Sequence, residues 1–143
     1  TKLEPLWQSH NEVRLLIGKR LSHHGHGSFG LPGGLLKFGE TWEECGRREL
    51  FEETGVTVPT ETPFCFVHAT NNIFRAESRH SVTIFLRAEI NSEIANQVEN
   101  KEPDKCEGWQ WISWKELVDL SPVFEPLRLL ISEKSEKDLF GGI

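Results

Sequence analysis

The chain has 143 residues, 37% of them hydrophobic and 27% charged, and its formal net charge is −6. This length predicts one domain over residues 1–143, with enough apolar residues to form a core. No apolar run approaches the ~20 residues of a membrane-spanning helix, so we expect no membrane partner. An acidic chain without a basic stripe also disfavours polymeric nucleic acid as a partner.

Three cysteines, Cys45, Cys65 and Cys106, are an odd number and lack the spacing of a metal site. Reduced thiols that pack inside a cytosolic protein explain them best, and we therefore expect a cytoplasmic location. No signal peptide is visible, but the chain contains no Met, so its targeting stays open.

Residues 12–19 (EVRLLIGK) predict a strand, because apolar and β-branched side chains dominate them. Residues 22–30 are rich in Gly and His and predict a loop, and residues 31–34 (LPGG) predict a short extended piece that ends in a turn. At Gly33 and Gly34 the backbone can come close to a ligand, since glycine has no side chain.

A helix is expected between Thr41 and Gly55. Thr41, with Glu44 three residues later, forms a capping box, which marks a helix start. Gly55 stands where a glycine commonly ends a helix, so about 13 residues would be helical. We expect the packing side of this helix to consist of Trp42, Cys45, Leu50 and Phe51.

The second half of the chain predicts further strands and two helices near its end. That order, with strands before and after one central helix, is typical of an α/β sandwich. We expect strands at residues 63–70, 81–89 and 107–112, a polar loop at 91–105, helices at 114–120 and 124–133, and a fraying end at 134–143.

The expected helix at 42–54 carries three acids, Glu49, Glu52 and Glu53, at spacings of three and four residues. Like charges at these spacings crowd on one side of a helix and repel each other. A solvated acidic face is the general explanation for such a cluster. A hard cation such as Mg²⁺ is the functional one, because it takes carboxylate oxygens and commonly shares a phosphate.

The segment around these acids resembles the Nudix box, the signature of hydrolases that cleave a nucleoside diphosphate linked to another group. The resemblance rests on nine defined positions: Gly34, Glu40, Arg48-Glu49-Leu50, Glu52-Glu53 and Gly55-Val56. Flanking segments, GKRLSHHGHGSFGLPGG and EPDKCEGWQWISWKEL, are similar to the small branch that cleaves nucleoside triphosphates. The resemblance implies an α/β/α sandwich, in which a mixed sheet lies between helices and the box forms one of the helices.

For the chemistry, the resemblance implies Mg²⁺-dependent hydrolysis of a nucleoside triphosphate to the monophosphate and pyrophosphate, with Mn²⁺ as a substitute ion. The ligands would be Glu49, Glu52 and Glu53 with the Gly33 carbonyl, and Glu52 is our choice of general base. Arg48 would hold the acidic cluster through Glu52 and Glu40. Gly34, Glu40 and Gly55 would be structural positions of the box.

Substrate contacts are expected outside the box. Lys19 and Arg20 could meet phosphates, with solvent-exposed charges as the equal alternative. Asn71 and Asn72 offer amide groups suited to a base edge. In the relatives that this chain resembles, the base pocket includes the start of the last helix, here Phe124 and Leu127, but Glu125 replaces a bulky aromatic and puts a specific purine in doubt.

Several alternatives stay open at this point. Trp109 and Trp111 alternate on a strand, which favours core packing over base stacking. His23, His24 and His26 favour loop residues over a metal tract, and His80 either contacts substrate or stabilises a loop. Other substrates are an oxidised purine nucleotide, dihydroneopterin triphosphate, a dinucleotide, a nucleotide sugar or a prenyl diphosphate, and a non-catalytic nucleotide sensor and a homodimer are further hypotheses.

One departure from the resemblance concerns the start of the chain. Members of this family begin with an apolar strand ahead of the segment equivalent to residues 12–19, and residues 1–11 (TKLEPLWQSHN) do not supply a clear one. Either that strand is degenerate, or sequence is absent between Trp7 and Asn11.

Overall fold

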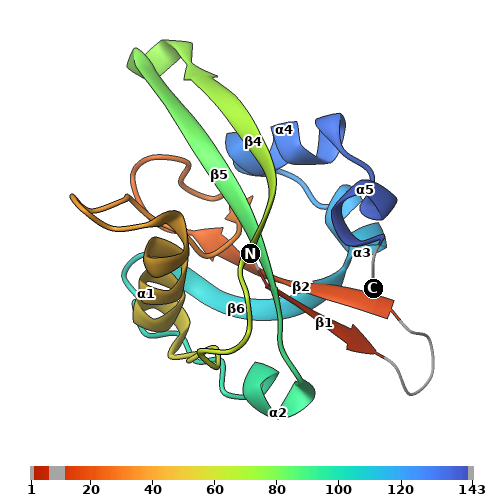
Figure 1. Cartoon of the computed structure of the whole chain (residues 1–143). Helices are drawn as coiled ribbons and strands as arrows, with labels where there is room; N and C mark the ends of the chain where they lie inside the picture. Colours follow the sequence, from red (N-terminus) through yellow and green to blue (C-terminus); the bar gives the residue numbers. More distant parts are fainter. Residues whose placement is uncertain (1, 7–11, 142–143) are drawn as a thin grey trace.

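The computed structural model of the chain describes residues 2–6 and 12–141, and of residues 2–6 and 12 the backbone alone (Figure 1). A mixed sheet runs through the molecule, with helices against both of its faces. Its strands are β1 (Lys2–Leu6), β2 (Glu12–Arg20), β3 (Phe29–Gly30), β4 (Cys65–Phe74), β5 (Arg79–Glu89) and β6 (Cys106–Ser113). The helices are α1 (Trp42–Thr54), α2 (Ser92–Ala95), α3 (Trp114–Val118), α4 (Glu125–Glu133) and α5 (Glu136–Phe140), with a 3₁₀ turn η1 (Arg75–Glu77).

Strand β2 organises the sheet. It pairs antiparallel with β6 along one side, and with β1 and then β3 along the other. β1 continues the sheet by a parallel pairing with β5, which forms a long antiparallel hairpin with β4. The α/β/α sandwich with a mixed sheet that the sequence predicts is therefore confirmed.

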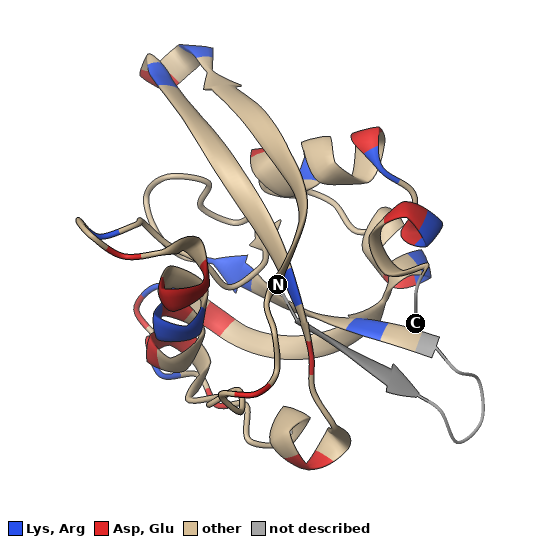
Figure 2. Cartoon of the chain, viewed as in Figure 1, with Lys and Arg blue, Asp and Glu red and all other residues tan. Residues whose placement is uncertain are grey.

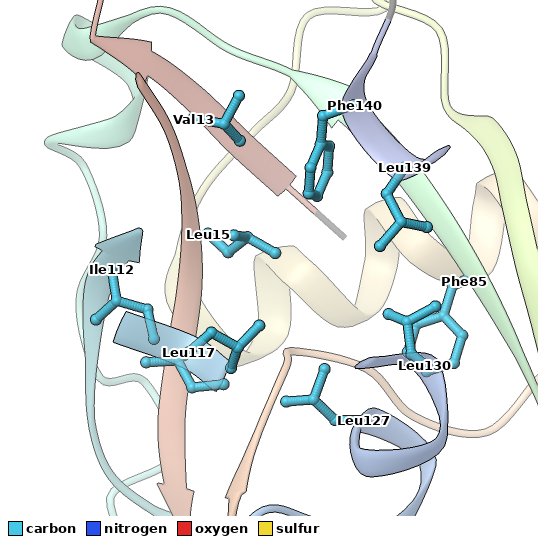
Figure 3. Packing of buried hydrophobic residues seen from close by; sticks show 10 residues of the cluster. Val13, Leu15, Phe85, Ile112, Leu117, Leu127, Leu130, Leu139 and Phe140 are labelled. Atoms are coloured by element: carbon cyan, nitrogen blue, oxygen red, sulfur yellow. The ribbon is translucent and has the colours of Figure 1, made fainter. Parts of the chain in front are cut away.

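Two apolar cores lie on opposite faces of the sheet, because successive side chains of a strand point to opposite sides. Leu15 and Ile17 of β2 point into the core that α3, α4 and α5 cover, whereas Leu16 points into the core beside α1. Figure 3 shows the first of these cores, in which side chains from β2, β5 and β6 meet those of the C-terminal helices. Its buried members are Val13, Leu15, Ile17, Phe85, Ile112, Leu117, Leu127, Leu130, Leu139 and Phe140.

Helix α1 begins and ends where its capping residues predict. The Thr41 side chain accepts from the Glu44 N–H, and the Glu44 side chain accepts from the Thr41 N–H, which completes the capping box. Gly55 ends the helix in the left-handed region, at φ 75°. The expected packing side is wrong in part: Leu50 is buried, but Trp42 and Phe51 are each about half exposed.

The start of the chain fits the alternative of a degenerate strand, and the end of the chain differs from the sequence expectation. β1 exists despite its weak apolar pattern, because it pairs with β2 on one side and β5 on the other. The proposed gap between Trp7 and Asn11 lies outside the described residues. At the other end, residues 136–140 form α5 instead of fraying, since Leu139 and Phe140 are buried against the sheet. Within the described residues, no helix is long and apolar enough to cross a membrane.

The remaining elements fall close to their predicted ranges. β4 and the start of β5 extend beyond expectation into a hairpin that projects from the body of the molecule in Figure 1. The loop expected at residues 91–105 contains the short helix α2, which the Asn91 side chain caps by accepting from the Ile94 N–H. All three cysteines are free. Cys106 is buried, Cys45 is partly buried and Cys65 is exposed, so the packing interpretation is wrong for Cys65.

Candidate active site

A cavity of about 450 Å³ lies beside α1, where the loop before that helix meets the ends of β2 and β6 and the segment before β6. It brings together the glycine turn, the acids of α1 and several cations from segments far apart in the chain. The residues that line it are Gly18, Arg20, Ser22, Gly30, Leu31, Gly33, Gly34, Leu35, Leu36, Lys37, Arg48, Glu49, Glu52, Glu53, Asn100, Glu102, Lys105, Cys106 and Trp109.

The three predicted ligand carboxylates, Glu49, Glu52 and Glu53, all line this cavity. Glu53 Oε2 accepts from the Gly33 N–H at 2.9 Å, which ties the turn to the last turn of α1. Gly34 lies directly over Glu49, and a Cβ atom at position 34 would overlap the Glu49 carboxylate. A side chain at position 34 would therefore displace the Glu49 carboxylate from its present position.

Arg48 connects the acids to the loop before α1. Its Nε and Nη2 donate to the two oxygens of Glu40, at 2.6 and 2.9 Å, and Nη2 also donates to the Leu35 carbonyl. Its Nη1 donates to Glu49 at 2.7 Å and to Glu52 at 3.2 Å. A bidentate pair of this kind fixes a guanidinium in one orientation, so the contacts support the positioning role predicted for Arg48.

The pairing with Arg48 leaves its mark on Glu40. Hydrogen bonds from Arg48, together with one from the Lys37 N–H, lower the pKa of Glu40 to about 2. The same contacts raise the pKa of Arg48. Glu40 is therefore a permanent anion whose charge is used to hold Arg48.

Glu53 has the opposite environment. Burial raises its pKa to about 8, and the charge of Glu49 adds to the effect. The Gly33 N–H and the more distant Arg20 oppose this shift without cancelling it. A carboxyl that is buried beside another carboxylate lacks sufficient positive charge nearby, which is the local condition that a bound cation relieves.

The C-terminal end of α1 is held by the segment that precedes β6. Glu99 N–H donates to the Thr54 carbonyl at 2.9 Å, and Lys101 N–H donates to the Glu53 carbonyl at 3.1 Å. The indole N–H of Trp109 donates to the same Glu53 carbonyl at 3.3 Å. These bonds satisfy carbonyls that a helix end leaves without partners, and they fix the acids of α1 relative to the sheet.

Of the two predicted phosphate contacts, Arg20 lines the cavity and Lys19 does not. Arg20 donates from Nε and Nη2 to the His24 carbonyl, and its guanidinium carbon lies 3.9 Å from the centre of the Phe124 ring. Burial lowers the pKa of Arg20, and Glu53 opposes that effect. The Lys19 ammonium instead lies 3.7 Å from Glu107, so the exposed-charge alternative describes it.

The residues expected to contact a base do not line the cavity. Asn72 is fully buried in the hairpin, where its amide donates to Ser81 and Thr83. Asn71 is exposed and its amide oxygen is hydrogen-bonded to the His80 ring. These contacts favour the loop-stabilising alternative for His80.

The last helix divides the two remaining substrate candidates. Leu127 is 2% exposed and belongs to the core. Phe124, at the N-terminal cap of α4, stacks on Phe74 at a ring distance of 6.0 Å and meets the edge of His24 at 5.3 Å. The His24 ring therefore packs in an aromatic cluster, and it is also hydrogen-bonded to Glu77.

Among the described residues no group of three His, Cys, Asp or Glu side chains has a metal-site arrangement.

Sequence reasoning missed several cavity residues, namely Lys37, Asn100, Glu102, Lys105 and Trp109. Trp109 packs against the second core, as predicted, but it also forms part of the cavity wall. Asn100 donates to the Cys106 carbonyl, and its own amide oxygen is buried without a hydrogen-bond partner. The polar run before β6 was the available signal, although its sequence alone reads as a solvated loop.

Comparisons with known proteins indicate the family of this chain. The family model described as NUDIX domain matches residues 5–132. A Danio rerio protein, oxidized purine nucleoside triphosphate hydrolase, is 38% identical over 74 residues, a match that covers 46% of this chain and 47% of that protein. The match therefore spans about half the length of that relative.

Solved structures show the same fold at lower identity. The crystal structure of a MutT NUDIX hydrolase from Burkholderia pseudomallei has a TM-score of 0.72 and 24% identity, and the alignment covers 94% of this chain and 95% of that one. The NUDIX domain of Shewanella oneidensis NrtR, crystallised with ADP ribose, has a TM-score of 0.69 and 21% identity over 90% of this chain and 79% of that one.

Proposed function

The chain belongs to the Nudix hydrolase family, and on that premise we propose that it hydrolyses a nucleoside triphosphate to the monophosphate and pyrophosphate. The observation that carries this proposal is the composition of the cavity. Three box carboxylates face a space of about 450 Å³ that also holds the cations Arg20, Lys37 and Lys105. Carboxylates for a metal and cations for phosphate oxygens are the two groups that phosphoanhydride cleavage requires.

The donor types suit a divalent cation, with Mg²⁺ proposed and Mn²⁺ as its substitute, although their side chains are not arranged around one point in the structure, where Glu49 and Glu52 face Arg48. Glu49, Glu52 and Glu53, with the Gly33 carbonyl, would hold the ion. The support is chemical: hard carboxylate oxygens line one cavity, and burial together with the charge of Glu49 raises the pKa of Glu53, so a nearby cation would stabilise its ionised form. Such an ion, when bound, neutralises phosphate charge and lowers the pKa of an attacking water.

The protein's own groups position the reactants. Arg20 is held by the His24 carbonyl and the Phe124 ring, so its guanidinium is oriented before a phosphate arrives. Glu52 is our proposed general base, because its side chain is 43% exposed while those of Glu49 and Arg48 are 16% and 19% exposed. A water in the cavity can therefore reach the Glu52 carboxylate.

For the identity of the substrate, we propose a purine nucleotide, in an oxidised or otherwise modified form. The support is the name of the Danio rerio relative, which is similar to half of this chain. Phe124 remains our candidate for a base contact, since its ring lies against Arg20, which lines the cavity. The buried positions of Asn72 and Leu127 give no support to their predicted roles.

The position of cleavage tests this function. Hydrolysis of a modified purine triphosphate in ¹⁸O-labelled water with Mg²⁺ should give the monophosphate and pyrophosphate, with label in one of them. A nucleoside diphosphate and orthophosphate would contradict the proposal. A Glu52→Gln variant should lose about 100-fold or more in rate, the usual range for a general base. Lys19→Ala is the matched control and should stay within about twofold of the parent, because Lys19 is an exposed charge outside the cavity.

A substrate panel separates this proposal from the other hydrolase functions. Dihydroneopterin triphosphate, dinucleotides, nucleotide sugars and prenyl diphosphates belong in that panel, because the box acids alone do not distinguish them. Binding without turnover of any of them would favour a nucleotide sensor.

The free state of Cys45, Cys65 and Cys106 supports the proposed cytoplasmic location. The proposed assembly is a homodimer.

A further inference from the structure

The β4–β5 hairpin has one apolar face that is exposed along its outer part, whereas Leu86 at its base is buried beside Gly46 of α1. The register pairs Phe66 with Leu86, Asn71 with Val82 and Ile73 with His80, and paired residues of antiparallel strands share a face. Val82 is 63% exposed, Phe66 is 55% exposed and Ile73 is 44% exposed. We call this surface the hairpin face; its members are Phe66, Ala69, Asn71, Ile73, His80, Val82, Ile84 and Leu86.

The opposite face of the hairpin is occupied. Thr70 and Asn72 are buried there and hydrogen-bond each other, and Phe85 enters the core with α4. The hairpin therefore buries one face inside the molecule and presents apolar side chains on the other. Contiguous apolar surface of this kind on a folded domain marks an interaction site more often than isolated exposed residues do.

One end of the hairpin face is hollow and the other end protrudes. Near the start of α1, a depression of about 430 Å³ is lined by Trp42, Phe64, Phe66 and Leu86, with Glu40, Thr41 and Glu43 on its rim. The Trp42 and Phe66 rings lie 6.1 Å apart, and Trp42 is 51% exposed. Toward the hairpin tip, Val82 and Ile73 are exposed on the same face, and neither lines that depression.

The charges along this surface also differ between its two ends. The tip carries Arg75 and Arg79 with Glu77 between them, whereas the start of α1 carries Glu43 and Glu44 (Figure 2). Glu43 pairs with Arg47 in its own helix, and Glu44 belongs to the capping box. Glu77 at the tip is hydrogen-bonded to His24, and with two Arg and one Glu the tip keeps a positive balance, whereas the hollow end is acidic.

We propose that the hairpin face binds a second copy of this chain in a two-fold symmetric dimer. Turning one copy by 180° about an axis near the middle of the hairpin places its protruding Val82 against the partner's hollow, and the reverse contact follows by symmetry. The same rotation brings the basic tip of each copy to the acidic start of the other copy's α1. Two ends that complement each other in shape and in charge favour a second copy over an unrelated partner.

The dimensions are adequate for such a dimer. From Phe66 to Ile73 the face runs about 25 Å, at ~3.3 Å per strand residue. Its half-exposed apolar side chains, with Trp42, offer on the order of 400 Å², judged from the area that large side chains bury. A standard interface uses about 800 Å² per partner, so the polar rim of Asn71, His80, Arg79 and Glu43 would supply the rest. Because this contact is symmetric, it closes at two copies.

Oligomeric state tests the proposal without reference to hydrolysis. Light scattering after size-exclusion chromatography, from about 1 to about 100 µM protein, should give the mass of a dimer at the upper end. Val82→Asp and Phe66→Asp should each raise the dimer dissociation constant at least about tenfold, because a charge would enter the apolar contact. Val118→Asp is the matched control: Val118 is 44% exposed but lies on α3, outside the hairpin face.

Further variants separate a lost interface from a lost fold. Val82→Thr keeps a β-branched residue in the strand and should weaken the dimer with little change in melting temperature. Arg79→Glu should weaken the dimer, and combining it with Glu43→Arg should restore it in part. A monomer at every concentration would overturn the proposal. So would a dimer that folded Val82→Asp and Phe66→Asp proteins retain, or that Val118→Asp disrupts equally.

Discussion

Glu40 and Glu53 belong to the same sequence motif, and the structure gives them opposite electrostatic environments. Glu40 accepts two hydrogen bonds from Arg48, and its pKa falls to about 2. Glu53 is buried beside Glu49, and its pKa rises to about 8. The Glu40 carboxyl therefore loses its proton far more readily than the Glu53 carboxyl at the other end of the acidic cluster.

The difference distinguishes a structural end of the motif, at Glu40, from an end suited to ligand binding, at Glu53. At the Glu40 end the negative charge already has its partner, so nothing further needs to bind there. At the Glu53 end the charge is unbalanced, and a ligand of opposite sign would gain most by binding. Arg48 joins the two ends because one guanidinium contacts both Glu40 and Glu49.

The largest effect should follow from the unbalanced end. On the proposed function, Glu53→Gln should reduce Mg²⁺-dependent hydrolysis by about 100-fold or more, because it removes a proposed ligand charge at nearly constant shape. Steady-state kinetics with a triphosphate substrate measures this. Glu43→Gln is the control on the same helix, since Glu43 does not line the cavity. Equal losses in both variants would contradict the comparison.

The connection between the two ends can be broken at Arg48. Arg48→Lys keeps the charge but loses the two-pronged pairing, so kcat should fall roughly 10- to 100-fold as the acids lose their position. The melting temperature should fall as well. Arg47→Lys provides the contrast, because Arg47 donates to the carbonyls of Val58, Pro59 and Thr62 away from the cavity.

The kcat values, measured beside thermal melting, should separate these two arginine variants. Arg47→Lys should melt at a lower temperature than the parent and keep kcat within about twofold, since it changes stability without moving the acids. If Arg48→Lys keeps full activity while it melts earlier, Arg48 is a stabilising residue alone and does not position the cluster.

Mg²⁺ binding near Glu53 should raise the stability of the folded protein. An ion that binds the folded state alone stabilises it by mass action, by about 2.7 kcal/mol at 100 times its dissociation constant. Melting curves with and without millimolar Mg²⁺ should therefore differ by a few degrees for the parent. Glu53→Gln and Glu49→Gln should respond less, and an unchanged parent would count against a metal site.

The smallest and most specific effect is the pH dependence of stability without divalent ions. Glu53 has a folded pKa of about 8, above the ordinary glutamate pKa of 4.5, so the folded state retains the proton to higher pH and stability falls as the pH rises between these values. Glu40 has a folded pKa of about 2, so its contribution is present above 4.5 and is lost as the pH falls toward 2.

Urea unfolding across this pH range, with a chelator present, distinguishes the two carboxyls. Glu53→Gln should flatten the decline on the alkaline side, and Glu40→Gln should flatten the loss on the acid side. The comparison fails if the two variants follow the same curve, because the cluster would then titrate as a whole.

The sequence predicted the box helix well because its signals are local. The Thr41–Glu44 capping box and Gly55 fix both ends of α1 through contacts within a few residues. The acids of the box fall into one cavity for the same reason, since helix geometry alone places Glu49, Glu52 and Glu53. Predictions that depend on a single helix need no knowledge of the rest of the fold.

The errors concern residues whose surroundings come from distant segments. β1 lacks an apolar pattern and is defined by its pairing with β2 and β5. Asn72 resembles a ligand contact in sequence, but the register of the hairpin buries its amide among hydroxyl groups. Lys105 and Trp109 enter the cavity because the segment before β6 folds back on α1, which no local pattern indicates.

That fold-back has a consequence for how the site tolerates change in chain length. Surface loops generally accept insertions and deletions, since their ends can stay in place while the middle varies. The segment at residues 99–101 differs, because its backbone N–H groups hold the last carbonyls of α1. All the acids of α1 belong to one regular helix, whose backbone geometry fixes them relative to one another. Changing the length of this segment would therefore shift the box acids of that helix together. One deletion there would misalign carboxylates whose own sequence is intact.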